Sequence, residues 1–299
     1  EPGFTQPIMY KLIKEHSSVM QLYKVKLKKE RIINDDDVAE MEKKIQNTMD
    51  IDYTKAHKDS LEFHPDIPLA VSNEMISSYK TNEPTGVQID RLNNISEKIS
   101  SLPEDFRLHP KLTKFFEARR EFSTKDVKVD WSFAESLAFG SLLQEGNPIR
   151  LSGQDSARGT FSQRHIVITD MNNGNEYIPL NFISENQAKI EPLDSLLSEA
   201  AVLGFEFGYS IADPVTLVLW EAQFGDFANA AQVIIDNFIV SSYSKWKLPN
   251  NLVMLLPHGL EGQGSEHSSA RLERFLILCS DGNMIVANPT TPAQYFHLL

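Results

Sequence analysis

The sequence predicts an α/β protein in which a parallel sheet carries helices on both faces and follows a mostly helical region. From Asp130 onward, short apolar runs such as TLVLW (216–220) and LVMLLP (252–257) alternate with helical patterns. These runs lack a polar–apolar alternation, which is typical of strands whose two faces are both covered. Before Asp130 the chain is polar and helical. We therefore expect a helical connecting region at 1–129 and an α/β domain at 130–299.

Helical patterns in the connecting region are bounded by capping residues. Residues 17–32 begin with serine and place apolar side chains roughly on one face, which predicts a helix. Asn34 precedes three aspartates that suit the first turn of a helix at 35–49. Residues 52–86 have several prolines and no clean period, which predicts an irregular or mobile connection. Two further helices are expected at 89–101 and 109–122.

The second region opens with an apolar helix and then alternates. Residues 129–146 predict a helix that ends at Gly146, and NPIRLSG (147–153) follows as a short strand. MNNGN carries the Asn-Gly signal of a hairpin between 164–170 and 176–183. The remaining elements, in order, are expected to be a helix at 198–212, a strand at 216–222, a helix at 226–240, a strand at 251–257, a helix at 268–280, a strand at 284–289 and a helix at 291–299.

The bulk composition excludes several classes of protein. Residues 131–299 hold 8 Lys/Arg against 18 Asp/Glu, so a phosphate-backbone footprint, and hence a nucleic-acid partner, is not expected. No apolar run predicts a membrane span, and no N-terminal segment resembles a signal peptide. Cys279 is the only cysteine, which predicts a reducing, intracellular compartment. The chain opens with EPGF and stops within an apolar helical pattern, so we expect a segment truncated at the C-terminus.

Polar residues gather just after the predicted strands, where parallel sheets bind ligands. EAQFGDF follows one strand and HGLEGQGSEH follows the next. No metal-ligand spacing, no P-loop lysine and no nucleophile elbow around Ser268 or Ser269 is present in these loops. From the residues alone, Glu199 is explained as a first-turn carboxylate after the N-cap Ser198. By the same reasoning the phenylalanines would be core residues and the loop histidines surface residues.

Five motifs in order carry a specific resemblance: LSGQDSARGTFSQRH, LSEAAVLGFEFGYS, LWEAQFGDFANAAQVIIDNFI, LLPHGLEGQGSEHSSARLERF and PTTPAQYFHLL. With FTQPIMYKLI near the N-terminus, they resemble the thiamine-dependent first component of the 2-oxoglutarate dehydrogenase complex. The resemblance covers nearly the whole chain and is densest from Ile149 to Leu299. It implies a transketolase-like fold, with the cofactor held between the pyrimidine-side domain of one subunit and the diphosphate-side domain of another. This chain resembles the pyrimidine side and the helical connection before it.

The resemblance also implies roles for particular residues. Glu199 matches the carboxylate that hydrogen-bonds the pyrimidine ring nitrogen of thiamine diphosphate, and it should be buried and preferably protonated. Phe227, with Phe224 nearby, matches the aromatic position on which the pyrimidine stacks, and Gln223 lies in the same motif. These residues are the expected cofactor-binding set.

Two histidines are expected on the substrate side of the site. His258 and His267 lie in the loop that supplies such histidines in the family, and EHSS resembles a catalytic His-Ser element of related enzymes. We expect His267 to matter more, because the predicted helix at 268–280 places it at a helix start. Further site-forming or subunit-contact residues implied by the resemblance are Gln154, Asp155, Arg158 and Arg164.

The family pattern is incomplete in this chain. No Gly-Asp-Gly followed by Asn-Asn is present, so the magnesium and diphosphate ligands are expected in another domain, and none is expected here. We therefore expect this segment alone to neither decarboxylate nor bind the cofactor tightly. The resemblance implies a homodimer that acts on a 2-oxo acid and passes the succinyl group to a lipoyl-bearing succinyltransferase in the tricarboxylic acid cycle.

Two alternatives to this function remain open. The chain could come from a 2-oxoadipate-specific relative, because its motifs also suit that branch. It could also be a catalytically silent structural or dimerisation module. The expected location is the bacterial cytoplasm, with the mitochondrial matrix as the alternative.

Overall fold

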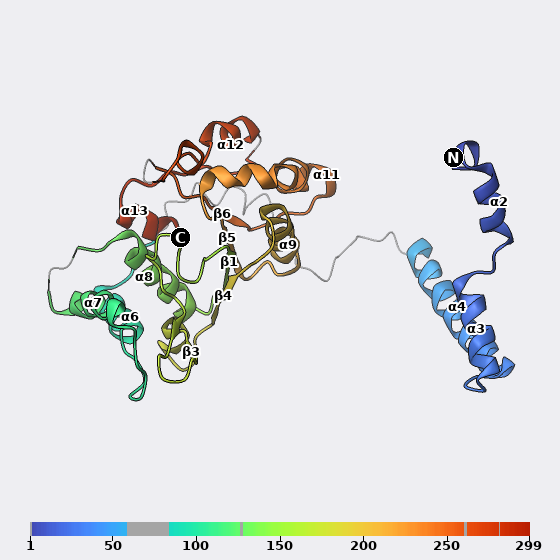
Figure 1. Ribbon diagram of the computed structural model, residues 1–299, viewed down its shortest axis with the longest axis horizontal. Coiled ribbons are helices and arrows are strands. Elements are labelled where there is room, and N and C mark those ends of the chain that lie inside the picture. The colour runs from blue at the N-terminus through green and yellow to red at the C-terminus, as the bar shows by residue number, and fades with distance from the viewer. Residues whose placement is uncertain (1, 59–83, 126–127, 260–261, 281) are drawn as a thin grey trace. The chain divides into compact units, whose positions relative to one another are not determined.

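The computed structural model describes residues 2–58, 84–125, 128–259, 262–280 and 282–299 (Figure 1). The chain divides into two compact units, Glu1–His64 and Pro65–Leu299. No helix within the described residues is long and apolar enough to cross a membrane.

The first unit is helical and has little core of its own. Its helices are α1 (Pro2–Thr5), α2 (Pro7–Glu15), α3 (Val19–Lys29) and α4 (Asp35–Lys58). A capping box joins Ser18 and Gln21 at the start of α3. Asn34 caps α4 as predicted, because its Oδ1 accepts a hydrogen bond from the Asp37 amide at 2.9 Å.

Residues 52–58 correct the sequence prediction, since they continue α4 instead of forming an irregular connection. The helix runs on because this stretch has neither proline nor glycine to stop it. Residues 84–86 are irregular as expected, and 59–83 lie outside the described residues.

The second unit is built on a four-stranded parallel sheet, which confirms the predicted α/β class. Its strands are β1 (Ile149–Gly153), β4 (Ile190–Asp194), β5 (Leu217–Glu221) and β6 (Val253–Leu255), in the order β4-β1-β5-β6. Gly153 pairs with both Asp194 and Glu221, and Glu221 pairs with Leu255. The carboxyl ends of all four strands are therefore level. Strand β4 was not predicted, because its proline and two acids give it no apolar run; such residues suit an edge strand.

Two hydrophobic cores lie on opposite faces of this sheet. Leu219 packs into one core with Phe133 and Leu137 of α8 (Trp131–Gln144), whereas Trp220 packs into the other with Leu203 of α9 (Glu199–Ala212). Neighbouring strand residues point to opposite faces, so both faces are covered. Figure 1 shows α8 and α9 on opposite sides of the strands.

The predicted connecting helices 89–101 and 109–122 are confirmed as α6 (Ile89–Ile99) and α7 (Pro110–Arg120), followed by η1 (Glu121–Ser123). Ile95 and Ile99 of α6 share the core of α8 and β1. A Cβ on Gly140 of α8 would lie 2.5 Å from Ile95 Cγ2, so the helices approach at a position where only glycine fits. The proposed domain boundary at residue 130 stays a prediction.

The Asn-Gly hairpin is confirmed. Strands β2 (Ile168–Thr169) and β3 (Glu176–Tyr177) form an antiparallel pair, and Gly174 in the turn has φ 77°. The short helix η2 (Pro179–Phe182) follows the hairpin.

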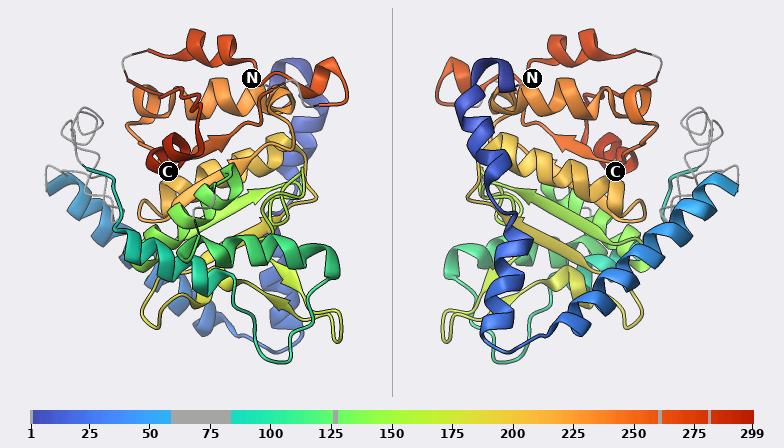
Figure 2. Two further views of the ribbon diagram at one scale, coloured as in Figure 1. Left: turned by 90° about the vertical axis from the view of Figure 1, so that its left-hand side faces the viewer. Right: turned by 90° about the vertical axis from the view of Figure 1, so that its right-hand side faces the viewer.

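The last third is less regular than predicted. The helix expected at 226–240 is a continuous but mixed segment: η3 (Gly225–Ala231), α10 (Gln232–Ile234) and η4 (Ile235–Ile239). It is followed by α11 (Ser242–Trp246), and after β6 come η5 (Ser265–His267), α12 (Leu272–Leu278) and α13 (Pro292–Leu298). Ile235 of η4 and Phe275 of α12 pack into the α9-side core, whereas Phe296 of α13 packs against the α8-side core. Figure 2 shows the orange and red helices of this last third at one end of the second unit.

Two predictions in this third are wrong. Residues 284–289 form no strand, because Met284 and Val286 pack onto the α9-side core instead of pairing with β6. The helix predicted at 268–280 begins only at Leu272, because Arg271 adopts a left-handed backbone conformation that interrupts it.

Candidate functional site

The level strand ends bring four loops together at one edge of the sheet. Gln154, just after β1, donates from Nε2 to Oε1 of Glu199 across 3.4 Å. Gln223, just after β5, donates from Nε2 to Oδ2 of Asp155 across 3.5 Å. These contacts join three loops that are far apart in sequence. A small pocket between them is lined by Gly153, Gln154, Leu197, Glu199, Val202, Trp220, Glu221 and Gln223.

Glu199 is the first residue of α9, as the sequence predicts. Its N-cap Ser198 has an extended backbone but makes no side-chain capping hydrogen bond. The carboxylate is half-buried, and Gln154 is its recorded hydrogen-bond partner. A carboxylate at this point is favoured by the positive end of the helix, and it remains open to a further donor from the pocket.

Aromatic rings form a second group at the same edge. The ring centroids of Phe224 and Phe227 lie 5.4 Å apart, and His267 lies 4.5 Å from Phe224 and 5.4 Å from Phe227. Phe161 adds a fourth ring 5.8 Å from Phe224. Edge-on contacts of this kind stabilise an aromatic cluster. The structure therefore brings the two predicted phenylalanines and His267 together.

The setting of His267 differs from the sequence prediction. It ends the short turn η5, five residues before α12 begins, so the helix end does not act on its ring. Its Nδ1 lies 3.1 Å from Oε1 of Glu266 but is buried without a well-formed hydrogen bond. Burial and the Glu266 contact close Nδ1 to a ligand, whereas Nε2 makes no hydrogen bond with the described residues and is the ring nitrogen left for one.

His258 is placed differently from His267. Its ring is exposed, and Nδ1 accepts a hydrogen bond from the Ala270 amide at 2.9 Å. This hydrogen bond connects the segment just after β6 with the residues just before α12. Within the described part of the chain, His258 makes no ring contact with Phe161, Phe224, Phe227 or His267.

Arg164 is buried inside the second unit, where it takes part in an ion-pair network. Its Nε lies 3.0 Å from Oε2 of Glu135, and its Nη1 donates to Oε1 of Glu221 at 2.7 Å and to the Ser156 carbonyl at 2.8 Å. Arg158 instead is half-exposed and pairs with Asp155 at 3.1 Å. The network thus fixes the end of β5 against α8.

The partners of Arg164 were missed by sequence reasoning. Glu135 is the single acid of the apolar helix WSFAESLAF, and that isolation was the available signal. Burial raises the pKa of Glu135, although Arg164 opposes the shift. Burial and the neighbouring Glu135 carboxylate also raise the pKa of Tyr295 well above its ordinary value.

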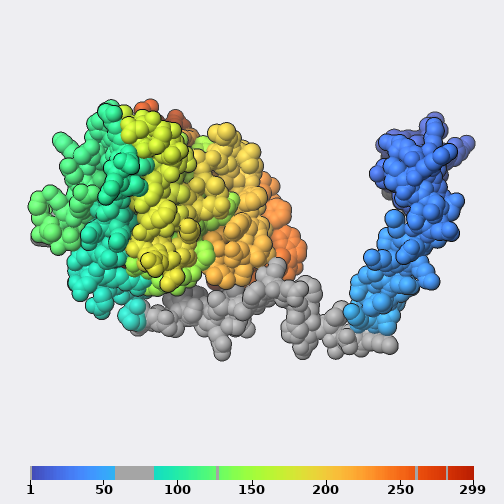
Figure 3. Space-filling view, turned by 90° about the horizontal axis from the view of Figure 1, so that it is seen from below, coloured from blue at the N-terminus to red at the C-terminus, as the bar shows by residue number. Residues whose placement is uncertain are grey.

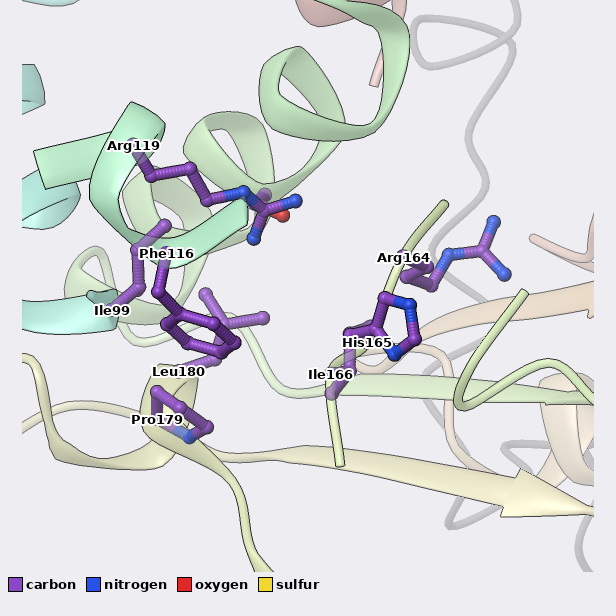
Figure 4. Close-up of a pocket in the computed structure, with 9 residues that line it drawn as sticks. Ile99, Phe116, Arg119, Arg164, His165, Ile166, Pro179 and Leu180 are labelled. Atoms are coloured by element: carbon purple, nitrogen blue, oxygen red, sulfur yellow. The ribbon is translucent and has the colours of Figure 1, made fainter. Parts of the chain in front are cut away.

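A second pocket lies away from Glu199 (Figure 4). Figure 4 shows Arg119 of α7 and His165 on opposite sides of this pocket, with the Arg164 side chain directed away from Arg119. Burial lowers the pKa of Arg119 to about 10, and burial also lowers the pKa of His165. The remaining lining residues are Ile99, Phe116, Ser136, Ile166, Pro179 and Leu180.

Strained backbone collects in the loops around the strand ends. Among the described residues, four of the six non-glycine residues with positive φ are Asp155, Ser162, His165 and Arg271. Such conformations concentrate at functional sites because the surrounding structure must hold them. The described residues contain no group of three or more His, Cys, Asp or Glu that could hold a metal ion.

Comparison with known proteins agrees with this geometry. Residues 127–299 match the family described as the transketolase pyrimidine binding domain. The chain is 48% identical over 302 aligned positions to the 2-oxoglutarate dehydrogenase E1 component of Brucella canis and to that of Brucella ovis, and 47% identical to that of Brucella anthropi. In each case the alignment covers all of this chain and 30% of the relative.

This chain therefore spans about a third of the length of those relatives. The family match covers the parallel sheet, the strand-end loops and Glu199. The fold, the site at the carboxyl ends of the strands and the match agree, and the chain belongs to the transketolase pyrimidine-binding domain family.

Proposed function

We propose that this chain forms the pyrimidine-side part of the first component of a 2-oxoglutarate dehydrogenase. The parent enzyme decarboxylates 2-oxoglutarate oxidatively and transfers the succinyl group to a lipoyl carrier. The observation that carries the proposal is the placement of Glu199 at the level strand ends, at the same edge of the sheet as an aromatic group, in a chain of the pyrimidine-binding family. The relatives are named for 2-oxoglutarate, so we take that substrate over 2-oxoadipate.

The strand-end residues fit thiamine diphosphate. When bound, the cofactor supplies the electron sink for loss of CO₂ from a 2-oxo acid. Glu199 is half-buried with one weak partner, so its carboxylate can hydrogen-bond a ring nitrogen of the pyrimidine and favour the required tautomer. Phe224 and Phe227 offer aromatic faces for stacking, and Gln223 lines the Glu199 pocket.

The two histidines act on the substrate side. His267 has its Nδ1 buried beside the Glu266 carboxylate, which leaves Nε2 to donate to or accept from a reacting group. His258 keeps its Nδ1 engaged with the Ala270 amide and leaves Nε2 for a second contact. Magnesium and the diphosphate are held by residues outside this chain.

The parent enzyme works as a homodimer with a lipoyl-bearing succinyltransferase, in the bacterial cytoplasm. Exposed apolar side chains around α9 support a subunit contact, since Leu196, Leu197 and Phe205 are 102%, 57% and 59% exposed. The yellow-to-gold surface in Figure 3 contains this segment. The Brucella relatives and their E1 name support the complex and the location.

Exchange of the thiazolium C2 proton with deuterium tests this function in the full-length protein. Glu199→Gln and Glu199→Ala should slow the exchange at bound cofactor by orders of magnitude, because the carboxylate no longer favours the basic tautomer. Glu206→Gln is the matched control, since Glu206 is the other carboxylate of α9 and instead pairs with Arg150 at 2.8 Å. Wild-type exchange in the Glu199 variants would reduce Glu199 to a helix-start residue and refute the proposal.

A further inference from the structure

The loop that bears His258 and His267 is closed on itself and fastened to the start of η3 at two points. We define the His loop as the described residues 257–259 and 262–271. Two hydrogen bonds close the loop, from Ala270 N to His258 Nδ1 at 2.9 Å and from Gly259 N to Ser268 O at 2.8 Å. Two others join it to η3, from Gly225 N to Pro257 O at 3.0 Å and from Arg271 Nε to Asp226 Oδ1 at 2.8 Å.

Glycine is required where the His loop meets η3. A Cβ on Gly225 would lie 2.5 Å from the Pro257 carbonyl oxygen and 2.7 Å from Ala270 Cβ. Within the loop, a Cβ on Gly262 would lie 2.5 Å from His267 Cβ. The His loop therefore packs directly against η3 with no room for a side chain between them, and the position of His267 depends on this packing.

Asp226 is the charged anchor of this arrangement. It lies between Phe224 and Phe227 in sequence and is 3% exposed. Its Oδ1 accepts from Arg271, whereas Oδ2 is buried and has no hydrogen-bond partner among the described residues. A buried carboxylate needs a cation, and Arg271 is the one recorded for Asp226 among the described residues. The ion pair therefore joins Arg271, the last residue of the His loop, to the segment that carries Phe224 and Phe227.

Arg271 occupies a backbone conformation that does not suit it. Its φ and ψ are 54° and 49°, in the left-handed region where a Cβ is unfavourable and glycine is not. An arginine also has no acceptor with which to cap α12, and no side-chain capping bond is present. Local structure thus gives no reason for arginine here, which leaves the contact with Asp226 as the reason.

We propose that Asp226 and Arg271 are positioning residues, whose ion pair holds His267 against Phe224 and Phe227. Neither touches the reacting atoms: the pair acts through the His loop by fixing its end beside the aromatic group. The catalytic consequence rests on the proposed function, whereas the effect on the His267 ring does not.

The first test uses the chain described here and needs no cofactor. With histidine labelled at Cε1, the His267 resonance should be displaced by the ring currents of Phe224 and Phe227. In Asp226→Asn and Arg271→Gly it should move to the position of a freely exposed histidine. Lys247→Gly is the matched control, because Lys247 is also left-handed, with φ 56°, but ends α11 outside the His loop. It should leave the resonance unchanged.

Stability separates positioning from a merely structural role. Arg271→Gly alone relieves backbone strain but leaves the buried Asp226 carboxylate without its cation, so it should lower the melting temperature. The double variant Asp226→Asn with Arg271→Gly leaves no uncompensated charge, so its melting temperature should fall little. In the full-length enzyme its kcat should nevertheless fall by about 100-fold, the size expected for a displaced catalytic group, with unchanged cofactor affinity. Arg271→Lys keeps the charge and should restore part of the activity.

The outcomes separate the two proposals. An unmoved His267 resonance in Asp226→Asn and Arg271→Gly would overturn the positioning role, whatever the activity. If Arg271→Gly does not fold, Asp226→Asn, which keeps the side-chain shape, decides alone. If the His267 resonance moves in the two variants but the full-length wild-type protein has no decarboxylase activity, the proposed function is refuted and the role of the ion pair stands.

Discussion

Arg164 binds Glu221 through two guanidinium nitrogens, and this contact holds the last residue of β5 against the body of the fold. The same guanidinium also binds Glu135 of α8, and all three side chains are at most 6% exposed. One cation thus serves two carboxylates in a low-dielectric setting. The residues that follow Glu221 belong to the candidate cofactor site, so the network fixes the strand end from which that part of the site begins.

Removal of the cation should be the most destabilising change in this network. Arg164→Met leaves two buried carboxylates without a partner, and breaking a buried pair in this way typically costs about 3–5 kcal/mol. Equilibrium urea unfolding of the chain measures the loss. Adding Glu135→Gln and Glu221→Gln to Arg164→Met should recover much of it, because no uncompensated charge remains. If the triple variant is no more stable than Arg164→Met, packing and not charge holds these residues.

Gly153 should tolerate no side chain. It ends β1, and a Cβ there would lie 2.3 Å from the Glu221 carbonyl oxygen of the neighbouring strand. Gly153→Ala must therefore push apart the two strand ends that border the Glu199 pocket, at a cost of about 1–3 kcal/mol. Gly86→Ala is the control, since nothing lies within 4 Å of its Cβ position. Equal unfolding free energies for the two variants would contradict this prediction.

Much of the fold follows from local patterns. Apolar runs without alternation mark β5 and β6, and Asn-Gly marks the hairpin, because each feature depends on neighbouring residues alone. Edge strand β4 escaped prediction, since an edge tolerates the proline and acids that hide it. The start of α12 was misplaced because a left-handed arginine has no sequence signature.

The candidate site was predictable only in part. Resemblance singled out Glu199, Phe224, Phe227 and His267, and the structure places them at the same edge of the sheet. The network around Arg164 could not be read from the chain, because Glu135 and Glu221 lie 29 and 57 residues away from it. Long-range pairing of charges depends on the folded topology, which no local pattern reports.

Phe224 and Phe227 should respond differently to truncation. Phe224 contacts three rings, those of Phe161, Phe227 and His267, whereas Phe227 contacts two rings, those of Phe224 and His267. Phe224→Ala should therefore lower the unfolding free energy more. If Phe227 is the stacking position, Phe227→Ala should weaken cofactor binding to the full-length enzyme more, by about 1–3 kcal/mol on the scale of base–aromatic stacking. Calorimetric titration measures both affinities. Equal losses of affinity and stability at the two positions would make both residues core.

His165 should make the stability of the chain depend on pH just below neutrality. Its pKa is lowered from 6.5, chiefly by burial, with a smaller contribution from Arg119 and Arg158, while a hydrogen bond to the Ser162 carbonyl opposes the shift. Between the lowered folded pKa and about 6.5, the unfolded chain binds more protons than the folded chain. The unfolding free energy therefore rises with pH through that window and levels off above it.

His165→Asn should remove this part of the pH dependence. Asparagine suits the site, because His165 has φ 49° and asparagine tolerates left-handed backbone. Urea unfolding at a series of pH values from about 5 to 8 should show a shallower slope below 6.5 in the variant than in the wild type. His16→Asn, at an exposed position in the first unit, should keep the wild-type slope of the second unit. An unchanged slope in His165→Asn would mean that other groups carry the titration.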